Sequence, residues 1–204
     1  MALSPMMKHY LETKEKYKVL SVEEIKGLLI DKKRYYAIFE GIKVCDNINF
    51  NLRKGEVLGI SGLMGAGRTE IMQAIFGNIP LKEGKMFIEG KEVSIKNPRQ
   101  AIANGIGFIT EDRKTEGLLL EKSIAENIEI ANLAKVSNSG VLNPKKQNEL
   151  VKKGIEEFRI RCFGPDHECN NLSGGNQQKV VLAKWIYKEP KILILDEPTR
   201  GVDI

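Results

Sequence analysis

The chain has 204 residues and a formal net charge of +5, and it is 42% hydrophobic and 29% charged. This length predicts a single domain with a buried core, and the composition excludes the disordered and fibrous classes of protein. The lysines and arginines are dispersed and are not interleaved with aromatic residues, so the positive charge alone does not indicate a nucleic-acid partner.

The first half of the chain combines short strand-like runs with one helix signal. Residues 1–34 predict a polar helical leader or linker, with a capping box at 21–24. Residues 35–52 alternate in the manner of two short antiparallel strands, and the apolar run 57–60 predicts a buried parallel strand. A glycine-rich loop and a helix follow, and we expect Gly77 to end that helix.

The second half predicts a hairpin at 89–90, a helix over 98–104 and a strand at 107–109. Residues 114–172 are more polar and mainly helical in pattern, which indicates an inserted helical lobe. The core then resumes with a further helix and a final apolar strand.

The glycine-rich loop, residues 62–69, follows the pattern Gly-x-x-x-x-Gly-Lys-Ser/Thr, with arginine where lysine is usual. In this pattern glycines let the backbone approach a phosphate, a cation reaches the β and γ oxygens, and a hydroxyl binds Mg²⁺. The candidate residues are Gly62, Gly65, Ala66, Gly67, Arg68 and Thr69. Arg68 keeps the charge but is longer and planar, so we expect nucleotide binding here, while hydrolysis at this loop is put in doubt.

An acidic pair, Asp196 and Glu197, ends the apolar strand at 192–195. Asp196 is suited to hold Mg²⁺ through water, and Glu197 is suited to polarise a water that attacks the γ-phosphate. Such a pair alone would also fit a capped strand end at the surface. The residues that follow, Pro-Thr-Arg-Gly-Val-Asp, favour the nucleotide function.

A second segment suited to bind phosphate lies at residues 172–178, Leu-Ser-Gly-Gly-Asn-Gln-Gln. A serine and two glycines before a helix present a hydroxyl and backbone N–H groups at a helix start, where the dipole favours anions. The candidate residues are Ser173, Gly174, Gly175 and Asn176. Two phosphate-binding segments and one acidic strand end in the same chain indicate a nucleotide-binding protein that works as a dimer.

Together these motifs resemble an ATP-binding cassette (ABC) ATPase domain. Residues 62–70, 110–114, 172–179 and 196–203 are similar to the second nucleotide-binding domain of carbohydrate-import ATPases of the ribose and galactose type, and the likeness covers residues 36–204. The resemblance implies an α/β fold of P-loop NTPase type over residues 35–204. It also implies an antiparallel β subdomain and an inserted helical subdomain at about 114–172.

The resemblance also implies ATP and Mg²⁺ as cofactors and adds further site residues. Phe39 falls where the family places an aromatic that stacks on adenine, although a strand core residue fits as well. Glu111 takes the position where many relatives have a glutamine near Mg²⁺ and the water, and it cannot donate as an amide does. Asp203 lies in the loop that follows the acidic strand.

In this family two domains pair head to tail, so Ser173 and Gly175 are expected to serve the nucleotide of a second nucleotide-binding domain. The Arg68 site would then mainly bind ATP, and the intact segment 172–178 would complete the competent site. The implied partners are this second domain, membrane permease subunits and, indirectly, an external sugar-binding protein. Because residues 1–20 contain no apolar signal core, we expect the protein to stay in the cytoplasm. The resemblance implies a peripheral location on the cytoplasmic side of the membrane.

The chain ends at Ile204, directly after Asp203, before the position of the γ-phosphate-sensing histidine that the family implies. His9 and His167 do not replace it, so the sequence predicts a fragment or a truncated gene product.

Three other interpretations stay open. The domain could bind ATP and only couple or regulate, or it could be a soluble ABC ATPase that acts on nucleic acid, although we find no basic aromatic strip for such a partner. The loop 162–169 carries Cys162, His167 and Cys169, but three ligands at this spacing fit a zinc site poorly, and ordinary loop residues are the simpler expectation. The odd count of three cysteines indicates a reducing compartment without disulfides.

Overall fold

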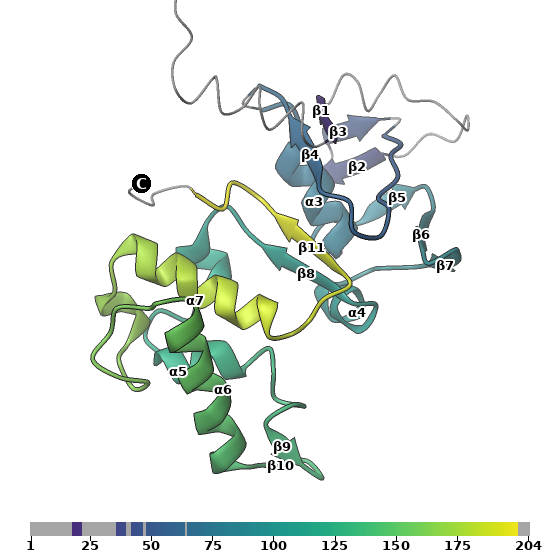
Figure 1. The fold of residues 1–204 in the computed structure, drawn as a ribbon. Coiled ribbons are helices and arrows are strands. Elements are labelled where there is room, and N and C mark those ends of the chain that lie inside the picture. Colours follow the sequence, from purple (N-terminus) through teal and green to yellow (C-terminus); the bar gives the residue numbers. More distant parts are fainter. Residues whose placement is uncertain (1–17, 22–35, 40–41, 47, 64, 200–204) are drawn as a thin grey trace, which may run out of the picture. The chain divides into compact units, whose positions relative to one another are not determined.

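The computed structural model describes residues 18–21, 36–39, 42–46, 48–63 and 65–199. The chain divides into two compact units, Met1–Gln100 and Ala101–Ile204 (Figure 1). The bounds of the elements below are those of the structure.

Among its described residues, the first unit contains short sheets and the nine-residue helix α3. Strand β2 (Tyr36–Phe39) is antiparallel to β3 (Ile42–Asp46) and to β5 (Leu81–Glu83), which confirms the antiparallel pair predicted for 35–52. The predicted hairpin at 89–90 is formed by β6 (Met86–Ile88) and β7 (Lys91–Val93).

The leader is not wholly helical, so the prediction for this segment was wrong in part. Residues Lys18–Ser21 form strand β1, which pairs in parallel with β4 (Leu58–Ser61) in the register Lys18 to Leu58. A parallel pair joins segments that are distant in sequence, and this tertiary contact overrides the local helix signal. The rest of the leader lies outside the described residues.

Helix α3 (Arg68–Phe76) follows β4 and ends where the sequence predicted. Ile71, Ala74 and Phe76 are buried in the first unit. Gly77 adopts the left-handed φ of +81°, and its N–H donates to the carbonyl of Ala74 at 3.2 Å. A glycine in this conformation satisfies the open carbonyls at a helix end, so it stops the helix. Helix α4 (Pro98–Ala103) lies where the units divide.

The second unit is built on two parallel strands, β8 (Ile106–Ile109) and β11 (Ile192–Leu195). Every residue of β8 is buried, as expected for a strand covered on both faces. Helix α7 (Gly174–Ile186) packs against β8 (Figure 1), and a Cβ on Gly107 would come within 3.1 Å of the Trp185 ring. The small residue therefore sets how closely helix and strand approach.

The longer regular elements between β8 and α7 are helices, and turns and loops make up the rest. The elements here are the π-helical turn η1 (Arg113–Gly117), α5 (Ile124–Glu129), the hairpin β9 (Ser137–Asn138) and β10 (Val141–Leu142), α6 (Pro144–Glu157), and the 3₁₀ turn η2 (Cys169–Asn171). Helix α5 packs against α6 and α7 (Figure 1), and its buried face includes Ile124 and Ile128. Within the part of the chain that the structure describes, no helix has the length and apolar character needed to cross a membrane.

Candidate functional site

The glycine-rich loop at residues 62–69, called the phosphate loop below for its proposed role, leads from β4 into the first turn of α3 in the first unit. Gly67 is the N-cap of α3 with a left-handed φ of +86°, and no side chain caps this helix start. The Ala66 N–H donates to the Leu63 carbonyl at 3.0 Å and closes the turn. Gly65 has a left-handed φ of +79°, and a Cβ placed on it would meet no heavy atom within 4 Å. Arg68 and Thr69 occupy the first turn of α3, where the helix dipole favours an anion.

The acidic strand end lies in the second unit at the carboxyl edge of β8 and β11. The register pairs Ile109 with Leu195, and the Asp196 N–H donates to the Ile109 carbonyl at 2.9 Å. This pairing brings the chain after β8, with Glu111, to the same sheet edge as Asp196 and Glu197. The carboxyl edge of parallel strands is where ligands bind in open α/β sheets.

The two acidic residues differ in burial and in backbone conformation. Asp196 is 7% exposed, whereas Glu197 is exposed. Glu197 has a left-handed φ of +43°, which a residue with a side chain seldom adopts. Such a conformation costs on the order of 1–3 kcal/mol and is often found at functional sites.

The segment at residues 172–178 forms the start of α7. Ser173 is the N-cap and is exposed, and its Oγ accepts a hydrogen bond from Asn176 Nδ2 at 3.0 Å. Asn176 Oδ1 in turn accepts from the Arg161 N–H at 2.9 Å. Gln177 is buried, and its Nε2 donates to the Cys169 carbonyl at 3.0 Å. Buried Gln177 thus anchors a helix start whose serine faces solvent.

These motifs fall within a region of the chain that matches a known protein family. The family model described as ABC transporter matches residues 45–200. The chain belongs to the ABC transporter family.

Its relatives include ribose import ATP-binding proteins RbsA. That of Bacillus licheniformis is 56% identical over 161 residues, which cover 79% of this chain and 33% of the relative. That of Bacillus subtilis is 53% identical over 159 residues, which cover 78% of this chain and 32% of the relative. This ABC domain therefore spans about a third of the length of the curated relatives it matches.

Solved ABC cassettes share the fold. The cassette MJ0796, in a dimeric post-hydrolysis state bound to ADP and Pi, superposes with a TM-score of 0.68 at 23% identity and covers 84% of this chain and 73% of that one. The ADP conformation of the cassette MJ1267 gives a TM-score of 0.61 at 25% identity, covering 84% of this chain and 70% of that chain. The predicted α/β fold of P-loop NTPase type is confirmed.

The structure places the site residues predicted from the sequence in three groups. The phosphate loop is one group in the first unit, while the acidic edge with Glu111 and the segment 172–178 lie in the second unit. Phe39 is described only as the last residue of β2, and Asp203 lies outside the described residues.

Two polar residues of the second unit were missed in the sequence. Asp112 caps η1 by accepting from the N–H groups of Lys114 and Thr115 at 2.9 and 3.3 Å. These bonds, that to Lys114 first, lower the pKa of Asp112. An aspartate before a helical turn is an N-cap signal that could have identified it. Lys184 of α7 reaches the Gly117 carbonyl at 2.6 Å, and no sequence pattern marks this contact.

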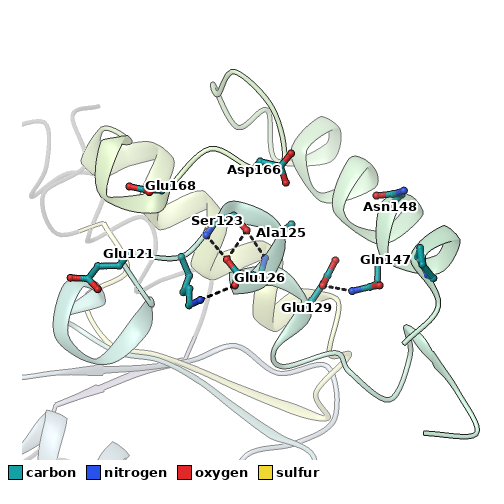
Figure 2. Close-up of a pocket in the computed structure, with 11 residues that line it drawn as sticks. Glu121, Ser123, Ala125, Glu126, Glu129, Gln147, Asn148, Asp166 and Glu168 are labelled. Carbon is teal, nitrogen blue, oxygen red and sulfur yellow. Dashed lines mark hydrogen bonds and ion pairs between the residues drawn. The ribbon is translucent and has the colours of Figure 1, made fainter. Parts of the chain in front are cut away.

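A polar hollow of about 520 Å³ lies in the helical part of the ABC domain (Figure 2). Five of its eleven lining residues are acidic, and Figure 2 shows the Glu126 carboxylate hydrogen-bonded to Ser123. The same carboxylate lies 3.1 Å from the Lys122 ammonium. Glu129 accepts from Gln147 Nε2 at 2.8 Å. The full lining is Glu121, Lys122, Ser123, Ala125, Glu126, Glu129, Pro144, Gln147, Asn148, Asp166 and Glu168.

The loop 162–169 borders this hollow without gathering its cysteines and histidine as a metal site. His167 Nδ1 accepts from the Phe163 N–H at 3.3 Å, and buried Cys169 accepts from Asn127 Nδ2 at 3.3 Å. Among the described residues, no group of three His, Cys, Asp or Glu side chains could hold a metal ion.

Proposed function

We propose that this ABC domain binds ATP and couples its hydrolysis to sugar uptake, as the second nucleotide-binding domain of a ribose-type importer. The observation that carries the proposal is the 56% identity with a ribose import ATP-binding protein over 161 residues. The family match at residues 45–200 adds support, because it includes the phosphate loop, the segment 172–178 and the acidic strand end.

The phosphate loop is the proposed site for the phosphates of ATP. A Cβ on Gly65 would meet no heavy atom within 4 Å, the first turn of α3 carries no side-chain cap, and Arg68 adds a cation there. Phe39 is the proposed contact of the adenine ring.

The donor atoms of the domain suit Mg²⁺. Thr69 offers a hydroxyl and Asp196 a carboxylate, and Mg²⁺ prefers hard oxygen ligands. Bound Mg²⁺ supplies positive charge that neutralises the phosphate oxygens. Glu197 is the proposed base that polarises the attacking water, Glu111 would help to place that water from the same sheet edge, and Asp203 would contribute from the following loop.

The second proposed role is to complete a partner's site. The exposed Ser173, with Gly174, Gly175 and Asn176, would bind the γ-phosphate of ATP held by a second nucleotide-binding domain. Arg68 replaces the usual lysine, so we propose that the domain's own loop mainly binds nucleotide while its serine-glycine helix start drives turnover.

The assembly proposed around this domain follows the importer type. Two nucleotide-binding domains would pair head to tail on the cytoplasmic face of permease subunits, which receive sugar from an external binding protein. We propose the division of the chain into a leader or linker at 1–34 and an ABC domain at 35–204. Residues 114–172 would be its helical subdomain and would contact the permease.

The test compares two substitutions in the transporter reconstituted with its partner domain and permease. Ser173→Arg places a bulky cation where a phosphate would bind, and we expect ATP turnover to fall by about 10²-fold or more. Arg68→Ala is expected to weaken one nucleotide site and leave most of the turnover. Asn170→Arg adds the same charge at an exposed residue nearby and is expected to change nothing. If Arg68→Ala is the more damaging substitution, the division of roles is wrong.

A second candidate function, ATP binding without hydrolysis, is favoured by Arg68 alone. Radiolabelled ATP that is retained without phosphate release, even when the partner domain is present, would support this alternative over the first.

A further inference from the structure

Lys184 of α7 makes a contact that the proposed chemistry does not use. Its ammonium donates to the main-chain carbonyl of Gly117 at 2.6 Å, across 67 positions of sequence. Burial lowers the pKa of Lys184, with the nearby thiol of Cys169 opposing this shift. Lys184 is half-buried, and its ammonium contacts the Gly117 carbonyl oxygen and lies 5.7 Å from the centre of the Trp185 ring. A lysine that is partly withdrawn from water needs such polar or aromatic partners.

The carbonyl that accepts this bond belongs to Gly117, the last residue of η1, the π-helical turn that follows Glu111. Short π-helical segments are rare, and they are frequently found at functional sites. Gly117 closes the turn in a tight space, because a Cβ there would lie 3.2 Å from the Arg113 Cβ and 3.4 Å from the Val181 Cγ2. The turn is therefore pressed against α7, and the Lys184 ammonium holds its last carbonyl.

The ammonium that donates this bond belongs to α7, the helix that begins within the segment 172–178. The carbonyl of the same residue, Lys184, accepts from Asn132 Nδ2 at 3.0 Å, so this point of α7 is fixed by two bonds. Ten residues of helix separate Lys184 from Gly174, or about 15 Å at a rise of 1.5 Å per residue. Val180, Val181 and Ala183 are fully buried on the way, so α7 is held firmly between its two ends.

We propose that Lys184 is a positioning residue that couples η1, and with it Glu111 at the acidic edge, to the Ser173 end of α7. A displacement of the turn would reach the serine-glycine helix start through the Gly117 carbonyl and the Lys184 ammonium. The consequence for catalysis rests on the proposed function, because only in an ATPase does the position of Ser173 set a rate.

The first measurement is amide hydrogen exchange in the full transporter. Lys184→Met keeps the length of the side chain and removes the donor, and a hydrogen bond from a charged group supports about a tenfold or larger change in exchange. We expect faster exchange both at Glu116, whose N–H donates to Asp112, and at Gln177, whose N–H donates to Ser173. Lys184→Arg keeps a cationic donor and should restore both. Lys188→Met is the control, since it makes the same change four residues further along the chain, just after α7 ends.

The second measurement is ATP hydrolysis by the same variants. Lys184→Met is expected to lower kcat about tenfold while the KM for ATP stays the same, because the phosphate loop belongs to the other unit. Exchange that rises at Glu116 alone, or an unchanged kcat in an active transporter, would overturn the proposal. If the unmodified protein does not hydrolyse ATP, the proposed function fails, and the exchange at Glu116 and Gln177 still decides whether Lys184 couples the two segments.

Discussion

Two glycines of the first unit share a left-handed backbone conformation but differ in how much space surrounds their Cα atoms. Gly77 and Gly90 both have left-handed φ values, +81° and +77°. A Cβ on Gly77 would lie 2.8 Å from the Asn97 main-chain nitrogen, whereas one on Gly90 would meet nothing within 4 Å. We expect both alanine variants to lose about 1–2 kcal/mol from the left-handed conformation.

Gly77→Ala is expected to lose about 1–3 kcal/mol more, because the Asn97 backbone must shift to admit the methyl group. Denaturant unfolding of the two variants measures the difference. Equal losses would mean that the backbone around Asn97 relaxes freely.

At the residue scale, the buried thiol of Cys169 is expected to be unreactive. Burial raises its pKa to about 11, so the thiolate, which is the reactive form, is scarce at neutral pH. Cys162 is half-buried and should react first with a thiol reagent. In a Cys45→Ser background we expect one rapid thiol at pH 8 and a second only after unfolding.

The raised pKa of Cys169 also makes the stability of the folded protein depend on pH, in a direction that can be stated. A thiol whose pKa is higher in the folded state than its ordinary 9.0 contributes stability below pH 9, and this contribution is lost as the pH rises toward 11. Cys169→Ala should remove this part of the pH dependence. A rapid second thiol at pH 8 in folded protein would contradict the burial of Cys169.

At the scale of elements, α5 depends on its N-terminal cap. The Ser123 Oγ accepts from the Glu126 N–H at 3.1 Å, and the Glu126 carboxylate accepts from the Ser123 N–H at 2.9 Å. Ser123→Ala removes one half of this reciprocal pair, so we expect a loss of about 1 kcal/mol in the free energy of unfolding. Ser94→Ala, at an exposed serine outside any helix, serves as the control in thermal unfolding.

Elements that depend on local pattern were predicted from the sequence. The end of α3 at Gly77, the hairpin around Glu89 and Gly90, and α7 after Ser173 all follow from caps, turns and periodicity within a short window. Strand β1 was missed because it is formed by pairing with β4, whose residues lie 40 positions later in the sequence. The π-helical form of η1 was missed because its spacing resembles an ordinary helix.

The candidate site residues that were predicted are likewise those that a local sequence pattern identifies. The phosphate loop and the segment 172–178 were identified because each is contiguous in sequence, and the acidic pair because it ends an apolar strand. The pairing of β8 with β11, which brings Glu111 to the edge of Asp196, depends on a register that no local pattern contains. The bond from Lys184 to Gly117 is hidden for the same reason, since its two ends carry no shared motif.

At the scale of the whole molecule, the two segments proposed to bind phosphate belong to different units, so their proposed roles in binding and turnover can be tested separately. If the domain's own loop binds ATP, Mg·ATP should raise the thermal midpoint of the protein, because a ligand at 100 times its Kd adds about 2.7 kcal/mol. Arg68→Ala should reduce this rise, since it removes the cation at the start of α3. Ser173→Arg should leave the rise intact, because Ser173 is proposed to serve the partner's nucleotide.

AMP, which lacks the β and γ phosphates, is the ligand control and should give little or no rise, because the loop is proposed to bind those phosphates. Pairing this measurement with turnover gives each residue a distinct result: Arg68→Ala loses binding and keeps most turnover, while Ser173→Arg keeps binding and loses turnover. A Ser173→Arg protein that no longer responds to Mg·ATP would mean that the helix start of α7 acts on the domain's own nucleotide, and the head-to-tail division would be wrong.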